Sequence, residues 1–396
     1  MAMNQQVLQG SNKVLDIAFN RPALVGREVQ YIRDAIRRGQ LSGDGYYTRF
    51  CNERIEQLTG SRKALLTHSC TAALEMAAIL CDLKPGDEVI MPSFTFVSTA
   101  NAVTLRGATP VFVDLDPATL NVCPHRVADA VSKNTRAIFA VHYAGFPADM
   151  DSLGSIARDA DCLLIEDAAQ ALGSTYKGRP AGCLGDMAAF SFHETKNIIA
   201  GEGGALTVNR EDLCDRAEII REKGTNRSKF FRGQVDKYTW VDIGSSFLPG
   251  ELIAAYLYAQ LEMAEMINTR RLSIFDRYME AFNPLASHGR VSVPRVPAHT
   301  TGNGHMFYLL LRDLEDRSAF IAYMRSHGII CPFHYVPLHN APAGQRYGRT
   351  VGPMCVTQRI SDTLVRLPMY FELGSQVEDV IDVALGYFDC TNGGNQ

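Results

Sequence analysis

Short apolar runs alternate with helical stretches through the first two thirds of the chain. The runs rich in β-branched and aliphatic residues predict strands at residues 63–66, 88–91, 110–114, 137–142, 163–167, 188–193 and 205–209. Between them, segments rich in Ala, Leu and Met predict helices at residues 71–83, 98–106 and 150–160. This alternation predicts an α/β fold, in which helices flank a mostly parallel sheet on both faces.

The pattern changes after residue 250. Residues 250–282 read as long helix, and a proline-rich stretch at residues 293–297 follows. Beyond it the pattern predicts a strand at 306–311, a helix at 318–327 and a strand at 329–334. We therefore expect a large domain of residues 1–282, which includes the amino-terminal segment, and a smaller α+β domain of residues 283–396.

Composition narrows the class of protein. The 396 residues are 46% hydrophobic and 21% charged, with a net charge of −4 and acids and bases spread along the chain. No basic stripe marks a nucleic-acid or anionic-membrane surface, and no apolar run is long enough to span a bilayer. Residues 1–6 lack a signal-peptide pattern, and the ten cysteines show no C-x-x-C spacing. We expect a cytoplasmic protein with reduced thiols.

Two residues suggest a specific chemistry. Asp167 follows Glu166 directly after the apolar run 162–165. Lys196 lies between a strand-like run and the glycine loop 201–204. This combination suits pyridoxal phosphate, which Lys196 would carry as a Schiff base while Asp167 kept the pyridine nitrogen protonated. The alternatives are that Lys196 is a surface lysine and that Asp167 caps a following helix.

Other residues could bind the same cofactor. Ser69, Cys70 and Thr71 join a predicted strand to a predicted helix, where free N–H groups and hydroxyls would cradle a phosphate, or simply form a helix cap. Ser191 is a further candidate phosphate ligand. Gln170 would either reach the cofactor ring or lie on a helix surface.

Three further patterns leave alternatives open. Phe94 and Phe96 follow a strand, where aromatic residues are usually core, although one could stack on the cofactor. The run 334–339 contains His334 and Tyr335 but lacks the spacing of a zinc site, so we expect no metal. The basic and aromatic segment 220–238 is either a solvated loop or a surface for a diphosphate-bearing substrate.

Several segments together resemble the DegT/DnrJ-type sugar-nucleotide aminotransferases, which are fold type I pyridoxal phosphate enzymes. The resemblance runs from about residue 39 to residue 385, and it rests on residues 41–45, 84–90, 92–99, 166–169, 191–197, 201–204 and 334–339. Family members that dehydrate similar sugars carry histidine in place of the lysine, so the presence of Lys196 disfavours that branch.

The resemblance implies a transaminase that uses L-glutamate and a nucleotide sugar, with Phe96 stacked on the cofactor. Segments 191–197, 221–240 and 242–246 resemble members that aminate the 4-keto carbon of a dTDP-linked 6-deoxyhexose. The alternatives are a 3-keto or differently based nucleotide sugar, a lyase or dehydratase, and a non-catalytic regulator. The substrate contacts that we expect are Gly43, Lys223, Arg227, Arg232, His334 and Tyr335.

The resemblance also implies a homodimer whose active sites use both subunits. Ser246 stands where many family members have an asparagine that reaches the phosphate of the neighbouring subunit. We therefore expect Ser246 to contact the cofactor phosphate, with its hydroxyl in place of the family's amide.

Overall fold

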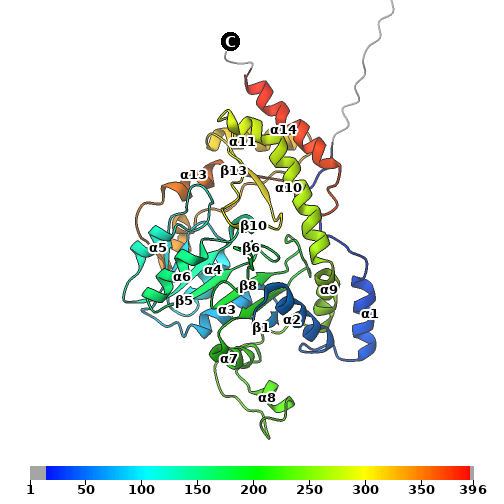
Figure 1. Ribbon diagram of the computed structural model, residues 1–396, viewed down its shortest axis with the longest axis vertical. Helices are drawn as coiled ribbons and strands as arrows, with labels where there is room; N and C mark the ends of the chain where they lie inside the picture. Colours follow the sequence, from blue (N-terminus) through cyan, green and yellow to red (C-terminus); the bar gives the residue numbers. More distant parts are fainter. Residues whose placement is uncertain (1–14, 393–396) are drawn as a thin grey trace, which may run out of the picture.

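The computed structural model describes residues 15–392, so the residues 1–6 assessed for a signal peptide lie outside it. Its centre is an eight-stranded sheet in the order β1-β9-β8-β5-β4-β2-β3-β12 (Figure 1). Strand β9 pairs antiparallel with β1 and β8, and all other neighbours pair in parallel. The strands are β1 Lys63–Thr67, β2 Glu88–Pro92, β3 Thr109–Val113, β4 Thr135–Val141, β5 Leu163–Asp167, β8 Met187–Ser191, β9 Gly204–Val208 and β12 Arg349–Thr350.

Side chains of these strands alternate between two buried faces. Phe139 and Ile165 pack in one core with helices α3, α4 and α7. Their neighbours Ile138 and Leu164 point the other way and pack with α5 and α6, and helices α2 and α9 cover the same side beside β1. Since both faces are covered, the strands read as continuous apolar runs. The helices are α2 Tyr46–Thr59, α3 Cys70–Leu80, α4 Val97–Thr104, α5 Pro124–Ala130, α6 Met150–Asp159, α7 Glu211–Arg221 and α9 Glu251–Glu262.

The α/β fold predicted from the sequence is therefore confirmed. Each of the seven strands predicted before residue 210 forms, with ends within about two residues of the prediction. The three helices predicted between them also form, and the first of them ends at Leu80 rather than at residue 83. The remaining short elements are α1 Glu28–Arg38, η1 Tyr143–Gly145, β6 Thr175–Tyr176, β7 Arg179–Pro180, α8 Arg227–Phe231, β10 Thr300–Thr301, η2 Leu338–Asn340 and α12 Pro342–Tyr347.

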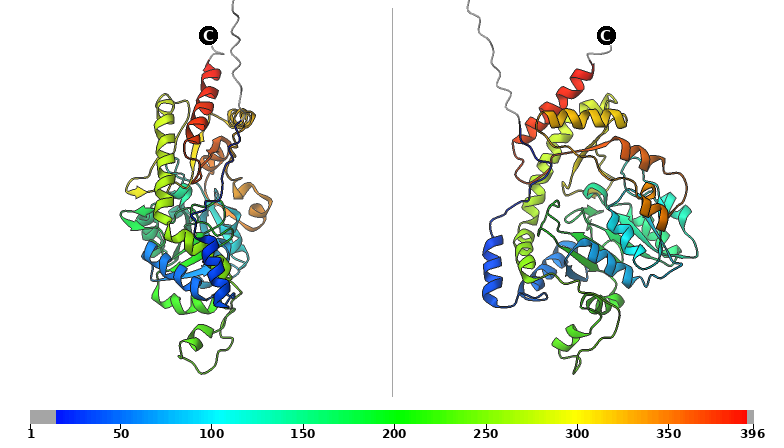
Figure 2. Two further views of the ribbon diagram at one scale, coloured as in Figure 1. Left: turned by 90° about the vertical axis from the view of Figure 1, so that its right-hand side faces the viewer. Right: turned by 180° about the vertical axis from the view of Figure 1, so that it is seen from behind.

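The carboxyl-terminal part forms its own core at one end of the molecule (Figure 2). Helices α11 Leu314–Ser326, α13 Cys355–Thr363 and α14 Gln376–Asn392 surround the pair β11 Phe307–Leu310 and β13 Leu364–Leu367. Ile17 from the amino-terminal segment packs in this same core. Helix α10 (Ala264–Ser287) runs unbroken through residues 282 and 283, so the division into two domains there stays a prediction.

The prediction of a strand at residues 329–334 is wrong. Ile329 and Phe333 form only isolated bridges, to Ile17 and to Val365, and β13 takes the place beside β11. Pro332 lies between the two bridges and has no N–H to donate, so a continuous ladder cannot form there.

All ten cysteines are free thiols. Between residues 15 and 392, no helix combines the length and apolar character that a bilayer span requires.

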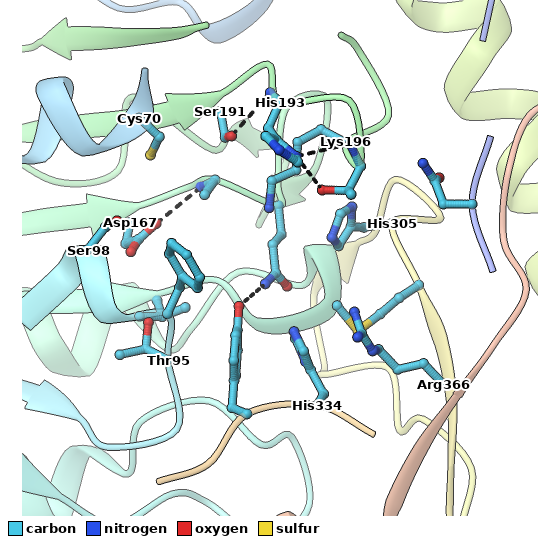
Figure 3. Close-up of a pocket in the computed structure, with 18 of the residues that line it drawn as sticks. Cys70, Thr95, Ser98, Asp167, Ser191, His193, Lys196, His305, His334 and Arg366 are labelled. Atoms are coloured by element: carbon cyan, nitrogen blue, oxygen red, sulfur yellow. Dashed lines mark hydrogen bonds between the residues drawn. The ribbon is translucent and has the colours of Figure 1, made fainter. Parts of the chain in front are cut away.

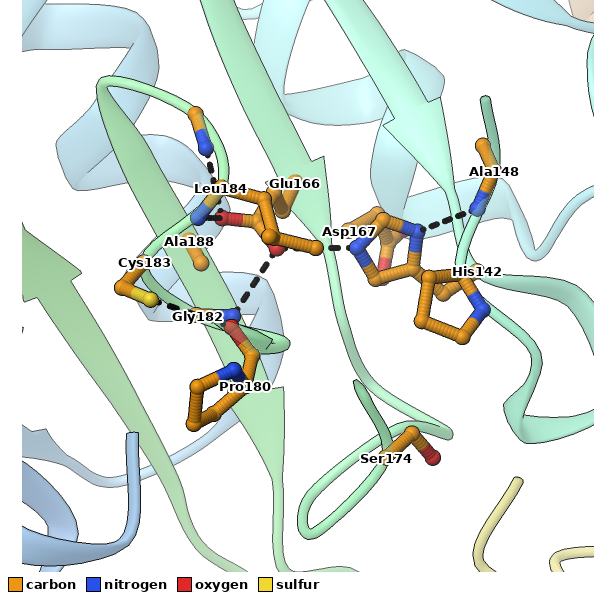
Figure 4. A network of polar contacts seen from close by, with 12 residues as sticks. His142, Ala148, Glu166, Asp167, Ser174, Pro180, Gly182, Cys183, Leu184 and Ala188 are labelled. Carbon is orange, nitrogen blue, oxygen red and sulfur yellow. Dashed lines mark hydrogen bonds and ion pairs between the residues drawn. The ribbon is translucent and has the colours of Figure 1, made fainter. Parts of the chain in front are cut away.

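Glu166 ties the central strands to the loop that precedes β8 (Figure 4). Its buried carboxylate accepts backbone N–H bonds from Gly182, Leu184 and Gly185, each 2.8 Å long. It also lies 2.9 Å from His142 Nε2. Because His142 Nδ1 accepts from the N–H of residue 148, Nε2 carries the ring hydrogen and donates to Glu166. Four donors thus satisfy one carboxylate that water does not reach.

We predict that Glu166→Gln lowers the free energy of unfolding by about 3 kcal/mol, because an amide replaces an acceptor of several charge-assisted bonds. Urea denaturation measures the change. The matched control is Glu265→Gln on the exposed face of α10, for which we expect a change within about 0.5 kcal/mol. Equal effects of the two substitutions would contradict the role assigned to Glu166.

Candidate active site

A cavity of about 700 Å³ opens at the carboxyl ends of the parallel strands (Figure 3). Parallel sheets of this kind bind ligands at that edge. Ten of the residues predicted from the sequence line it: Ser69, Cys70, Thr71, Phe96, Asp167, Gln170, Ser191, Lys196, His334 and Tyr335. Residues far apart in the sequence therefore share one enclosed space.

Asp167 is the last residue of β5 and is 5% exposed. Its Oδ2 accepts a 2.7 Å hydrogen bond from Thr99 Oγ1, and its Oδ1 accepts a 3.3 Å bond from the backbone of Ala169. Burial raises the pKa of the carboxyl, and Thr99, Ala169 and Lys196 oppose that rise. No helix follows β5, so the alternative that Asp167 is a helix cap is wrong.

Lys196 lies in the same cavity, in the loop between β8 and β9. Burial lowers the pKa of its amine, while Cys70 and Asp167 oppose that effect and the charge of Arg366 adds to it. A lowered pKa increases the fraction of neutral amine, which is the form that attacks a carbonyl and accepts a proton. Because Lys196 is only partly exposed and lines the cavity, the structure does not favour the alternative of a surface lysine.

The start of α3 forms a cradle for an anion. Ser69 caps the helix, since its Oγ accepts a 3.1 Å bond from the N–H of Ala72. Cys70 and Thr71, the first residues of the helix, leave their N–H groups outside the intrahelical ladder. Gly204 lets β9 pass behind this turn, because a Cβ there would lie 2.3 Å from the carbonyl carbon of Ser69.

Gln170 is buried in a turn, so its alternative position on a helix surface is wrong. Its Oε1 accepts a 2.7 Å bond from the N–H of Ala144, and its Nε2 donates a 3.2 Å bond to the hydroxyl of Tyr335. These bonds fix the amide at the wall of the cavity. Of the two candidate aromatic residues, Phe94 is 1% exposed in the core, while Phe96 lines the cavity and is 58% exposed.

His334 and Tyr335 form another part of the cavity wall. Their rings stack with centroids 3.6 Å apart, and His334 Nδ1 lies 2.9 Å from the hydroxyl of Tyr143. Burial and the charge of Arg366 hold the pKa of His334 well below its usual range, so its ring is neutral. Tyr335 has a φ of 49°, a left-handed conformation that a residue of this size seldom adopts. Within residues 15–392, no cluster of His, Cys, Asp or Glu is arranged to hold a metal.

Sequence reasoning missed several residues of the site. Phe19, Asn20, His305 and Arg366 line the cavity, and Thr99 donates a hydrogen bond to Asp167. Thr99 lies in the segment 92–99, so the strand-to-helix junction could have pointed to it. The others come from the amino-terminal segment and from the carboxyl-terminal part, and no local pattern marks them.

Five predicted residues lie outside this cavity: Gly43, Lys223, Arg227, Arg232 and Ser246. Lys223 precedes α8, Arg227 is its first residue and Arg232 follows its end, and Figure 1 shows α8 at the end of the molecule away from α14. Arg232 is paired with Glu218 at 2.8 Å, and Ser246 forms an isolated bridge with Glu222. The structure therefore does not place these five residues at the cavity of their own chain. That they act at the cavity of a second chain stays a prediction.

The cavity offers what pyridoxal phosphate needs. A buried carboxylate, an amine of lowered pKa and a helix start with free N–H groups face one space. Asp167 would hold the ring nitrogen, Lys196 the aldehyde carbon, and Ser69, Cys70, Thr71 and Ser191 the phosphate.

We predict that Asp167→Asn raises the free energy of unfolding of the cofactor-free protein at neutral pH. The pKa of Asp167 is raised above its ordinary value of 3.8, so burial penalises the charged form. That penalty is complete above the folded pKa and disappears as the pH falls below the unfolded value. Urea denaturation across a pH series measures the gain, which should shrink on acidification. The exposed Asp276→Asn is the control, and a loss of stability in Asp167→Asn at neutral pH would contradict the sign.

Known proteins resemble the chain over nearly its whole length. Residues 22–384 match the DegT/DnrJ/EryC1/StrS aminotransferase family. The spore coat polysaccharide biosynthesis protein SpsC of Bacillus subtilis is 31% identical over 381 residues, which cover 92% of this chain and 95% of SpsC.

Two solved structures share the fold. The aminotransferase TlmJ from Streptoalloteichus hindustanus is 29% identical with a TM-score of 0.86, and the match covers 95% of this chain and all of TlmJ. DesV from S. venezuelae is 29% identical with a TM-score of 0.82, and the match covers 90% of this chain and 93% of DesV. The chain belongs to the DegT/DnrJ/EryC1/StrS aminotransferase family, and it is a sugar aminotransferase of fold type I.

Proposed function

We propose that this protein moves an amino group from L-glutamate to the 4-keto carbon of dTDP-4-keto-6-deoxyglucose. The products are dTDP-4-amino-4,6-dideoxygalactose and 2-oxoglutarate, and pyridoxal phosphate is the cofactor. One observation carries the chemistry: Asp167 and Lys196 face a single buried cavity at the carboxyl edge of the sheet. The resemblance of segments 191–197, 221–240 and 242–246 supports the choice of sugar.

Each residue has a separate task in this proposal. Lys196 Nζ accepts a proton from the α-carbon of glutamate, and in the second half-reaction it delivers a proton to C4 of the sugar. When bound, the cofactor supplies the electron sink for both proton transfers. Asp167 keeps the ring nitrogen protonated, and its bond from Thr99 holds the carboxylate in place. His334 and Tyr335 would contact the sugar.

The proposal also includes a homodimer with shared active sites. Lys223, Arg227 and Arg232 lie on the segment 220–238, outside the cavity of their own chain. That segment carries exposed aromatic residues, among them Phe231 at 68% and Tyr238 at 54% exposed. We infer that its basic residues and Gly43 serve the nucleotide diphosphate at the site of a second chain, and that Ser246 reaches the cofactor phosphate there.

The alternatives differ in the sugar or in the reaction. A 3-keto substrate or another nucleotide base would use the same residues. A lyase or dehydratase would release no 2-oxoglutarate from glutamate, and a non-catalytic regulator would not need the buried pair Asp167 and Lys196.

We predict that the purified protein with pyridoxal phosphate converts L-glutamate and dTDP-4-keto-6-deoxyglucose to a 4-amino sugar, with one 2-oxoglutarate released per product. NMR identifies the aminated carbon. Lys196→Ala should lower turnover by about 10²–10⁴-fold, the contribution expected of a positioned acid and base. Amination at C3 would replace the proposed substrate, and near-normal turnover by Lys196→Ala would end the proposed chemistry.

A second prediction tests the shared sites. Lys196→Ala and Arg227→Ala are each expected to be impaired alone, because each removes a residue from every site. After the two variants are mixed under conditions that exchange subunits, random pairing restores about a quarter of the sites. Turnover before and after mixing measures this. Absence of recovery in a mixture shown to contain hybrid dimers would place Arg227 at the site of its own chain or at none.

A further inference from the structure

Arg366 is a cation of the cavity with no carboxylate partner in the part of the chain that the structure describes. It lies in β13 and lines the same cavity as Lys196. Its Nη2 donates a 3.0 Å bond to the carbonyl of Phe333, and its Nε is buried without any hydrogen-bond partner. Among residues 15–392, no carboxylate forms an ion pair with it. A largely buried guanidinium without a counter-ion is costly unless a ligand supplies the negative charge.

The other charged groups of the cavity do not supply that charge. Glu202, which also lines the cavity, lies 3.7 Å from His193 Nε2. Asp167 is engaged by Thr99 and Ala169. Arg271, a second buried cation, donates from Nε and Nη2 to the carbonyls of Gly304 and His305. Burial and nearby positive charges hold the pKa of His305 well below its usual range, so His305 adds no charge. Arg366 is therefore a lining cation with donors left for an anionic ligand.

The position of Arg366 separates it from the phosphate cradle. Figure 3 shows Cys70 and Ser98 on one side of the cavity and Arg366 on the other, beside His305 and His334. The cofactor phosphate would lie at the start of α3, next to Cys70. Yet Arg366 lines the same cavity as Lys196, so an anion bound by Arg366 shares the space in which the amine reacts. The anion it binds is therefore part of a substrate and lies near the reacting carbon.

The guanidinium is held in one orientation. Phe19 stacks on it, with the guanidinium carbon 4.5 Å from the ring centroid, and the backbone of Phe19 accepts a bond from the N–H of Met369. A fixed planar fork suits the two oxygens of a carboxylate. In an amino acid, a carboxylate is bonded directly to the carbon that reacts. The diphosphate of a nucleotide sugar is several bonds from C4 and fits this position less well.

Resting on the proposed function, we propose that Arg366 binds a carboxylate of the amino donor and so selects acidic amino acids for the first half-reaction. Phe19 and the carbonyl of Phe333 position the guanidinium for this contact. The sugar, which has no carboxylate, enters the same cavity afterwards and does not require the charge.

The test compares Arg366→Met with wild type, both loaded with pyridoxal phosphate. Glutarate has the carboxylates of glutamate but no amine and cannot react, so calorimetry measures its binding alone. We expect Arg366→Met to weaken glutarate binding about 10- to 100-fold, the factor that charged hydrogen bonds contribute. The concentration of glutamate that half-converts the cofactor absorbance should rise by a similar factor. Arg366→Lys, which keeps the charge but loses the fork, should lie between the two.

Arg312→Met is the matched control, because its exposed side chain pairs only with the neighbouring Asp313 among the described residues. It should bind glutarate as wild type does. L-Glutamine and L-isoglutamine each lack one carboxylate of glutamate, and the one whose affinity Arg366→Met leaves unchanged lacks the group that Arg366 binds. Melting temperatures of all variants establish that they are folded, and Arg366→Lys carries the test if Arg366→Met is not.

Two outcomes would overturn the assignment. One is unchanged glutarate and glutamate binding in folded Arg366→Met. The other is a selective loss of affinity for dTDP, which would mean that Arg366 serves the diphosphate. Failure of the proposed function is separate: wild type would then bind glutarate with the expected dependence on Arg366 but would aminate no keto sugar.

Discussion

The site depends on burying a carboxylate and an amine in one cavity of low polarity. Burial raises the pKa of Asp167 and lowers the pKa of Lys196, so each charged form is less stable than it would be in water. Thr99 and Ala169 offset part of that cost, because their hydrogen bonds satisfy the carboxylate of Asp167. The same burial makes the amine available as a base and the carboxylate available to a cationic ring.

Strand β5 ends in two carboxylates, one that supports the fold and one that faces the cavity. Successive residues of a strand point to opposite faces, so Glu166 and Asp167 face different surroundings. Glu166 is fully enclosed by backbone donors and His142, and it anchors the loop before β8. Asp167 faces the cavity with fewer bonds and can accept a ligand. Two adjacent acids thus perform different tasks because of the side of the sheet on which each lies.

The walls of the cavity come from three parts of the chain. The sheet edge contributes the reactive pair, the amino-terminal segment contributes Phe19, and the carboxyl-terminal part contributes His334 and Arg366. Ile17 is buried in the carboxyl-terminal core, so the segment that carries Phe19 is held by that core rather than by the sheet. The position of Phe19 over Arg366 therefore depends on packing remote from Lys196 in the sequence.

The sequence alone predicted the sheet, and it singled out Asp167 and Lys196, which the structure places in one cavity. Buried parallel strands are continuous apolar runs, and the cofactor requires a particular acid and lysine, so both leave local signals at β5 and at Lys196. It failed at residues 329–334, where Pro332 prevents a ladder that the apolar pattern suggested. Only the tertiary structure revealed Arg366 and His305 as neighbours of Lys196. It alone placed Gln170 in a buried turn, because contacts between distant segments leave no periodic trace in any one of them.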